Sequence, residues 1–140
     1  MKLSEMTFED SRMAEIKIST TVERIMSDKE TAALVDKLFN TKGLTLDPNM
    51  NKAKQEIAKA NYTKHRMEAT VGLTKRLIYS HYEELCEIFS VLNDKTKDEI
   101  KAWTRSEADK QLADMFQDEN LISFFMSSEA LVQAAQFATL

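Results

Sequence analysis

Apolar residues recur every three or four positions along most of this chain, which is the spacing of one face of an α-helix. A first helix is expected to follow Thr7, which can cap it together with Asp10 three residues later, and to run to about Met26. The residues predicted to form its buried face are Ala14, Ile18, Val22 and Ile25.

A second helix is predicted to begin at a Ser-x-x-Glu capping box, formed by Ser27 and Glu30, and to run to about Asn40. Gly43 is expected to terminate it, because glycine adopts the left-handed conformation at little cost. The residues predicted to share its apolar face are Thr31, Leu34, Val35, Leu38 and Phe39.

The middle of the chain places a polar helix before a strongly apolar one. Asp47 and Pro48 favour a helix start, so a third helix is expected over residues 48–69. Such a polar helix is either marginal alone or packed along one narrow seam, and its thin apolar stripe consists of Ala53, Ile57, Ala60 and Met67. Gly72 is expected to mark a break or a kink before a fourth helix over residues 73–92. The apolar pattern of that helix comprises Leu77, Ile78, His81, Leu85, Ile88, Phe89 and Leu92.

Short helices are predicted for the remainder of the chain. Asn93 and Asp94 indicate a turn, and Thr96 with Glu99 forms another capping box. Further helices are expected after Ser106, with Asp109 as its capping partner, and after Asp118, and a last stretch over residues 129–138 after Ser128. The pattern predicts an all-α fold, a compact bundle of about six to seven helices in a single domain.

Composition supports this fold class. The 140 residues include only two glycines and one proline, the residues on which the turns of sheet proteins depend, whereas helix formers are abundant. A chain of this length can bury one hydrophobic core. We expect a helical domain over residues 1–127, followed by an apolar helical tail over residues 128–140.

The end of the chain is unusually apolar, since Glu129 is its only charged residue from position 121 onward. Chain ends are usually polar, so this segment is expected either to fold back on the core or to meet a partner or another copy, and the sequence leaves both open. Core packing is expected for at least one of Phe124 and Phe125. The candidate partner-binding residues are Leu121, Ile122, Phe124, Phe125, Leu131, Val132 and Phe137.

A search for chemistry finds no catalytic, cofactor-binding or metal-ligating constellation, so the chain is not expected to be an enzyme. Cys86 is the only cysteine, and its position in an acidic, half-buried helix is expected to raise the pKa of its thiol. His81 is interpreted as a structural histidine. Gly43 and Gly72 stand alone and form no phosphate-binding loop.

The charge distribution bears on partners and location. The net charge of −4 argues weakly against general nucleic-acid binding, although residues 41–80 carry eight basic and three acidic side chains. The basic positions in and near the polar helix are Lys52, Lys54, Lys59, Lys64, Arg66, Lys75 and Arg76. The polar start of the chain, the single cysteine and the lack of a long apolar run predict a cytoplasmic protein without a membrane span.

Three segments, in order and at these distances, resemble the tail assembly chaperones of long-tailed phages and prophages of Gram-positive bacteria. Residues 1–7 read MKLSEMT, residues 77–100 read LIYSHYEELCEIFSVLNDKTKDEI, and residues 118–125 read DENLISFF. The resemblance extends from residue 1 to about 126 and is weakest over 41–70, where this chain is longer and more basic. Each segment alone is only a cap or a core stripe, and their joint order carries the resemblance.

The resemblance implies a helical, non-catalytic protein without cofactors that coats and solubilises the tape-measure protein before the tail tube forms. It also implies absence from the finished virion, and a longer form, made by ribosomal frameshifting, that recruits tail-tube protein. We further expect a homo-oligomer. The alternative from another class is a small helical DNA-binding or regulatory protein of phage or prophage origin, using the basic segment.

Overall fold

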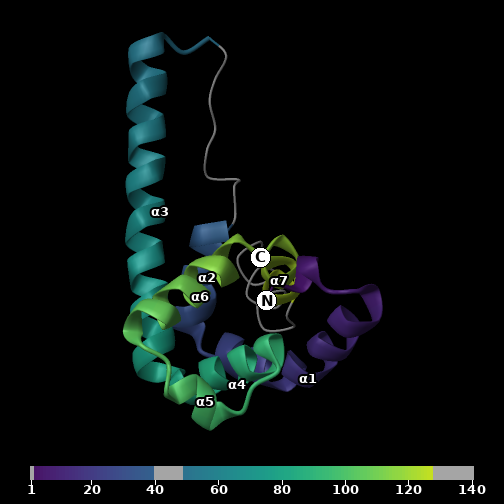
Figure 1. The fold of residues 1–140 in the computed structure, drawn as a ribbon. Coiled ribbons are helices and arrows are strands. Elements are labelled where there is room, and N and C mark those ends of the chain that lie inside the picture. The colour runs from purple at the N-terminus through teal and green to yellow at the C-terminus, as the bar shows by residue number, and fades with distance from the viewer. Residues whose placement is uncertain (1, 40–48, 128–140) are drawn as a thin grey trace.

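The structure is a computed structural model that describes residues 2–39 and 49–127. Within these ranges the chain forms seven α-helices and a short 3-10 helix and contains no strand, which confirms the all-α prediction (Figure 1). The elements are η1 (Leu3–Glu5), α1 (Phe8–Met26), α2 (Lys29–Phe39), α3 (Lys52–Ser80), α4 (Tyr82–Asn93), α5 (Lys97–Lys101), α6 (Arg105–Gln117) and α7 (Glu119–Met126). The positions of Gly43, of the pair Asp47 and Pro48, and of the expected stretch 129–138 lie outside the described residues.

Several helix boundaries follow the capping residues that the sequence indicates. The hydroxyl of Thr7 accepts a hydrogen bond from the backbone N–H of Asp10 at 3.1 Å, at the start of α1. Thr96 and Glu99 exchange both bonds of a capping box before α5. Asp94 ends α4 in the left-handed conformation, with φ of 50°, which an aspartate tolerates better than most residues.

Two predicted caps are wrong by one or two residues. Ser27 has a helical backbone conformation and its hydroxyl donates to the carbonyl of Arg24, so it closes α1. Asp28 takes the capping role instead and accepts from the N–H of Glu30 at 3.1 Å. Likewise α6 begins after Thr104, not Ser106, because Thr104 has the extended conformation that a cap requires and accepts from the N–H of Glu107.

The prediction of two helices over 48–69 and 73–92 is wrong, because α3 is one helix that runs through Gly72 without interruption. It starts at Lys52, after the cap Asn51, and the break comes only at His81. A Cβ atom added at Gly72 would lie 3.2 Å from Leu34 Cδ2. The glycine therefore allows α2 and α3 to approach closely, and it does not bend the helix.

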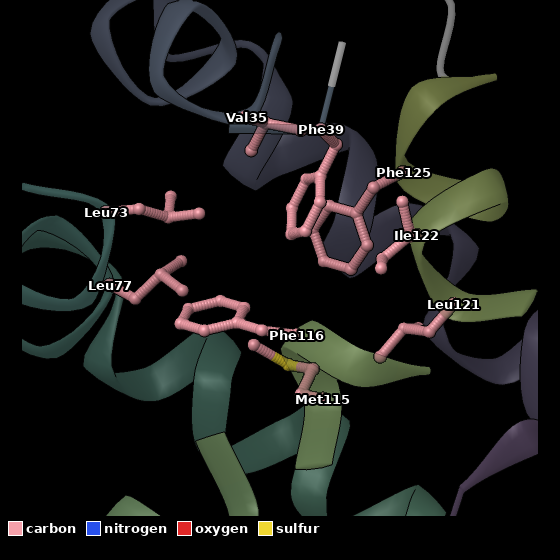
Figure 2. A pocket seen from close by; sticks show the side chains of 9 residues that line it. All are labelled: Val35, Phe39, Leu73, Leu77, Met115, Phe116, Leu121, Ile122 and Phe125. Carbon is pink, nitrogen blue, oxygen red and sulfur yellow. The ribbon is translucent and has the colours of Figure 1, made fainter. Parts of the chain in front are cut away.

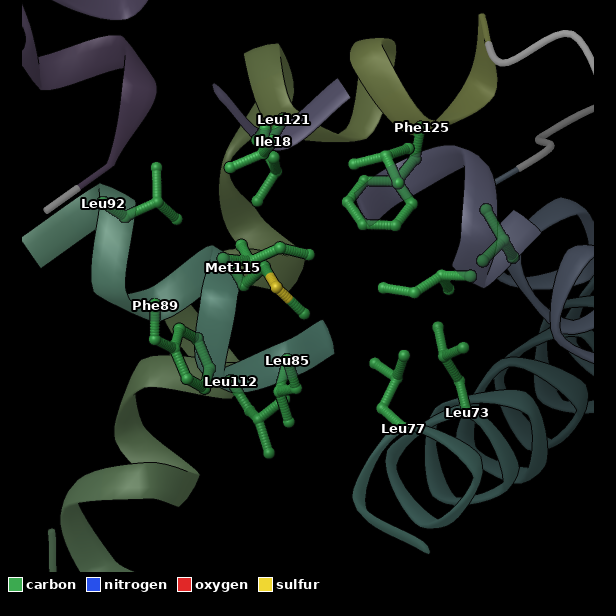
Figure 3. Packing of buried hydrophobic residues seen from close by; sticks show 14 of the residues in the cluster. Ile18, Leu73, Leu77, Leu85, Phe89, Leu92, Leu112, Met115, Leu121 and Phe125 are labelled. Atoms are coloured by element: carbon green, nitrogen blue, oxygen red, sulfur yellow. The ribbon is translucent and has the colours of Figure 1, made fainter. Parts of the chain in front are cut away.

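The core is built where the apolar faces of the helices meet (Figure 3). Packed pairs include α2 against α3 and α1 against α4, with α7 contacting both α1 and α2. All four residues predicted for the inner face of α1 are buried. Met115 of α6 lies in the middle of the cluster, between Leu121 of α7 and Leu77 of α3 (Figure 3).

Helix α3 extends far beyond this core (Figure 1). Its buried residues, Ala69, Leu73 and Leu77, all lie in the C-terminal half. The N-terminal half stands clear of the other helices (Figure 1). The sequence of that half is polar because this part of the helix has little contact with the core.

Candidate protein-binding site

A small gap in the apolar packing lies among α2, α3, α6 and α7, and we refer to it as the apolar depression (Figure 2). Figure 2 shows side chains from all four helices facing a common space. That space is about 20 Å³, room for little more than one water molecule. The space is therefore too small to enclose a small-molecule ligand, and only Phe39, Phe116 and Ile122 among its lining residues are half-buried, the others being buried. The residues that line it are Val35, Phe39, Leu73, Leu77, Met115, Phe116, Leu121, Ile122 and Phe125.

Side chains of α7 form one wall of the apolar depression. The cap Asp118 sets the start of α7 and so places Leu121, Ile122 and Phe125 toward α2 and α6 (Figure 2). The rings of Phe39 and Phe116, which also line the depression, lie 6.2 Å apart and tilted by 56°, an arrangement that aromatic pairs favour.

The predicted partner-binding residues divide into three groups. Leu121 and Phe125 are buried, with exposed fractions of 1% and 7%, so these two are chiefly core residues. Ile122 and Phe124 are half-buried, and Ile122 lines the depression whereas Phe124 packs beside the core outside it. Leu131, Val132 and Phe137 lie outside the described residues.

Six of the nine lining residues were not predicted as site residues, although each lies in a helix that the sequence indicated. Val35, Phe39 and Leu77 were assigned to apolar helix faces, with no sign of where those faces would meet. Their convergence depends on how α2 and α3 pack against each other. No local signal in the sequence reports that packing.

A second, larger space of about 260 Å³ lies between α3, α4, α5 and α6 and contains the thiol of Cys86. The rings of Phe89 and Trp103 lie at its edge, 5.6 Å apart and tilted by 45°. Burial raises the pKa of the Cys86 thiol, in spite of an opposing hydrogen bond with Tyr82 and the charge of Lys101. The raised pKa disfavours the thiolate, which is the nucleophilic form of a cysteine.

The strongest polar cluster joins α2 to the junction between α3 and α4. Nε2 of His81 lies 2.9 Å from Oδ2 of Asp28, and the Thr31 hydroxyl donates to the same oxygen at 2.9 Å. Arg76 donates to it as well and also pairs with Glu30 at 3.0 Å. His81 is thus a structural histidine whose ring ties the helix break to the cap of α2.

The projecting half of α3 carries the second candidate surface. Its predicted apolar stripe is exposed, with Ile57 at 62% and Met67 at 64%, and Val71 continues it. Among the predicted basic residues, Arg76 is committed to Asp28 and Glu30, and the guanidinium of Arg66 lies 6.0 Å from the Tyr62 ring. Basic and apolar side chains are therefore interspersed along this helix.

The described residues contain no group of three or more His, Cys, Asp or Glu side chains arranged to hold a metal ion. Among the same residues, none of the helices combines the length and the apolar character needed to cross a bilayer. Comparison with protein-family models, with curated proteins and with solved structures gives no match.

Proposed function

We propose that this chain is a non-catalytic tail assembly chaperone that binds the phage tape-measure protein in the host cytoplasm. The observation that carries the proposal is the half-buried apolar edge of the depression, formed by Phe39, Phe116 and Ile122 beside six buried lining residues. The resemblance of residues 1–126 to such chaperones supplies the identity of the partner.

The shape of the depression favours a helical partner. An amphipathic helix laid across α2 and α7 would place apolar side chains every three or four residues against Phe39, Phe116 and Ile122. Met115 lies at the base of this surface, and methionine adapts to irregular partners because its side chain is flexible and polarisable. A shallow surface of this kind gives modest affinity per contact, which suits a protein that coats a long partner in many copies.

The test is co-expression with the tape-measure protein of the same phage or prophage, followed by affinity capture and a solubility assay. We expect the tape-measure protein to become soluble and to elute with several copies of this chain. Insolubility with no co-elution would contradict the proposal. Salt-dependent binding of the chain to DNA would favour the alternative of a DNA-binding protein.

A matched pair of variants tests the surface. Ile122→Asp places a charge in the depression, and Ile16→Asp makes the same change at an exposed position of α1. We expect the first variant to lose tape-measure capture and the second to retain it, with both remaining helical by circular dichroism. Equal capture by both variants would show that the depression is not the binding surface.

Truncation after Ser127 tests the remaining predicted residues, Leu131, Val132 and Phe137. If they contact the partner, the truncated chain keeps its helicity and loses part of its capture. If the truncated chain unfolds, the tail belongs to the core.

A further inference from the structure

Five exposed apolar residues of α3, together with one lysine, form a heptad seam. From Ala53 onward, alternate steps of four and three residues reach positions that share one face of the helix, which is the spacing of a coiled coil. The seam residues are Ala53, Ile57, Ala60, Lys64, Met67 and Val71. This α3 seam spans about 27 Å at 1.5 Å per residue, and all six side chains are exposed.

The α3 seam faces away from the rest of the molecule. Each residue of a helix turns about 100° from the one before it, so Val71 lies on the side opposite Ala69 and Leu73. Those two residues are buried, whereas Val71 is 54% exposed. The helices that pack on α3 therefore leave this side open to another molecule.

The order of residues in the α3 seam is self-complementary when two copies run antiparallel. In the register with Ala60 of one helix opposite Lys64 of the other, the small alanine leaves space for the lysine stem. The same register places Ala53 opposite Val71 and Ile57 opposite Met67. Every seam residue then has an apolar side chain, or the apolar stem of a lysine, facing it.

Charges beside the α3 seam select the same direction. Lys54 and Glu68 occupy equivalent flanking positions, and the antiparallel register brings Lys54 of each helix next to Glu68 of the second copy. A parallel, in-register pair would instead place Lys64 against Lys64 and would form neither ion pair. An antiparallel pair also keeps the bodies of the two molecules apart, since each body lies at the C-terminal end of its α3 (Figure 1).

We propose that this chain forms an antiparallel homodimer through the α3 seam, with a two-fold axis that passes near Tyr62. The occupant of the seam is thus a second copy of this chain. The interaction is separate from the apolar depression, so it stands or falls independently of tape-measure binding. Two alanines and a lysine among six seam positions lower the affinity of the dimer. The monomer is therefore populated at low protein concentration.

Sedimentation of the purified chain over a wide range of concentration is the first experiment. We expect a monomer–dimer equilibrium that Ile57→Glu weakens by at least about tenfold, because it places a carboxylate in the seam. The matched control is Ile16→Glu, at a residue of similar exposure on α1, which should leave the equilibrium unchanged. A chain that stays monomeric, or a dimer that both variants weaken equally, overturns the proposal.

Charge reversal tests the direction of the helices. Lys54→Glu and Glu68→Lys should each weaken the dimer about threefold to tenfold, because each replaces two attractions with two repulsions. The double variant restores both ion pairs and should recover most of the affinity. Additive losses in the double variant would exclude this antiparallel register.

Cross-linking gives an independent readout. Cysteine variants Ala53→Cys and Val71→Cys should be linked efficiently by a short bis-maleimide when the two proteins are mixed. Each alone should be linked poorly, because identical positions are then about 27 Å apart along the helix axis. The native Cys86 is buried and does not compete. Preferential linking of Ala53→Cys to itself would indicate a parallel pair and would overturn the proposal.

Discussion

At the scale of single residues, long-range polar contacts decide details that the local sequence leaves undetermined. Ser27 and Asp28 are both good capping residues, and local pattern alone favoured the serine. Asp28 takes the role because its carboxylate also meets His81 and Arg76, 53 and 48 residues away. The structural role of His81 was predicted from the absence of ligand neighbours, but its partners could not be read from the sequence.

Asp28 makes the stability of the fold depend on pH. Burial alone would raise the pKa of its carboxyl, but hydrogen bonds from His81, Thr31 and Arg76, together with the charge of Arg76, hold that pKa far below its usual value. Its contribution to the free energy of unfolding is therefore complete above its unfolded pKa of about 4 and is lost as the pH falls below it.

The variant Asp28→Asn should lower the free energy of unfolding by about 2–4 kcal/mol at pH 7, because it leaves the partly buried Arg76 without its closest anion. Urea denaturation at several pH values measures this, and the difference from the natural chain should shrink below about pH 4. The exposed Asp109→Asn serves as the control, with an expected change below about 0.5 kcal/mol. A pH-independent difference at Asp28 would refute the role assigned to its charge.

Cys86 should react slowly with thiol reagents in the folded protein. The side chain is 3% exposed, and burial raises the pKa of the thiol, so little thiolate is present at neutral pH. Labelling followed by mass spectrometry should show a reaction at least about a hundredfold slower than in urea-unfolded chain. Comparable rates in the two states would show that the α4–α6 region opens freely.

At the scale of elements, the sequence predicted what is local and missed what depends on packing. The Thr7 and Thr96 caps, the turn at Asp94 and the inner face of α1 are all encoded within one or two turns of helix, and all were correctly identified. The prediction for Gly72 was wrong because the glycine leaves room for the side chain of Leu34, which lies on another helix. The break was expected there, whereas it lies at His81, where a side chain reaches the cap of α2.

Substitutions at Gly72 test its role as a point of close approach. Gly72→Ala gains about 1 kcal/mol of helix propensity, which should offset the displacement of the flexible Leu34 side chain and leave stability nearly unchanged. Gly72→Val adds a larger, branched side chain against Leu34 and should destabilise the fold by about 1–3 kcal/mol. Combining it with Leu34→Ala should recover part of that loss, as measured by thermal unfolding. If Gly72→Val matches the natural chain, α2 and α3 are not closely packed at this point.

At the scale of the whole molecule, the sequence indicated an all-helical chain with apolar residues left over for partners, but not their arrangement. The apolar faces of α2, α3, α6 and α7 were each recognised, yet their convergence into one depression is a tertiary fact. The thin stripe of residues 53–67 was recognised too, and the structure adds that it lies on a projecting half-helix. The polar character of the first half of α3 is explained by its exposure. The apolar character of α7 is explained partly by the packing of Leu121 and Phe125 in the core.

Asp118 joins the two ends of the described chain. Its Oδ2 accepts a hydrogen bond from the backbone N–H of Leu3 at 2.6 Å, and its Oδ1 caps α7 through the N–H groups of Asn120 and Leu121. The carboxylate is almost fully buried, so none of these donors has water as a ready substitute. One side chain therefore positions α7, with its wall of the apolar depression, against η1 at the start of the chain.

The variant Asp118→Ala should lower the free energy of unfolding by about 2–4 kcal/mol, because it removes a cap and leaves a buried N–H without an acceptor. The exposed Asp109→Ala is the matched control and should cost less than about 1 kcal/mol. Hydrogen exchange locates the effect: the amides of Leu3, Asn120 and Leu121 should lose protection in the variant, whereas that of Ile18 in the core should follow only the global loss. Since α7 lines the apolar depression, this variant should also capture less tape-measure protein at temperatures where it remains folded. Retained protection at Leu3 would show that η1 is held by the packing of its leucine and not by the carboxylate.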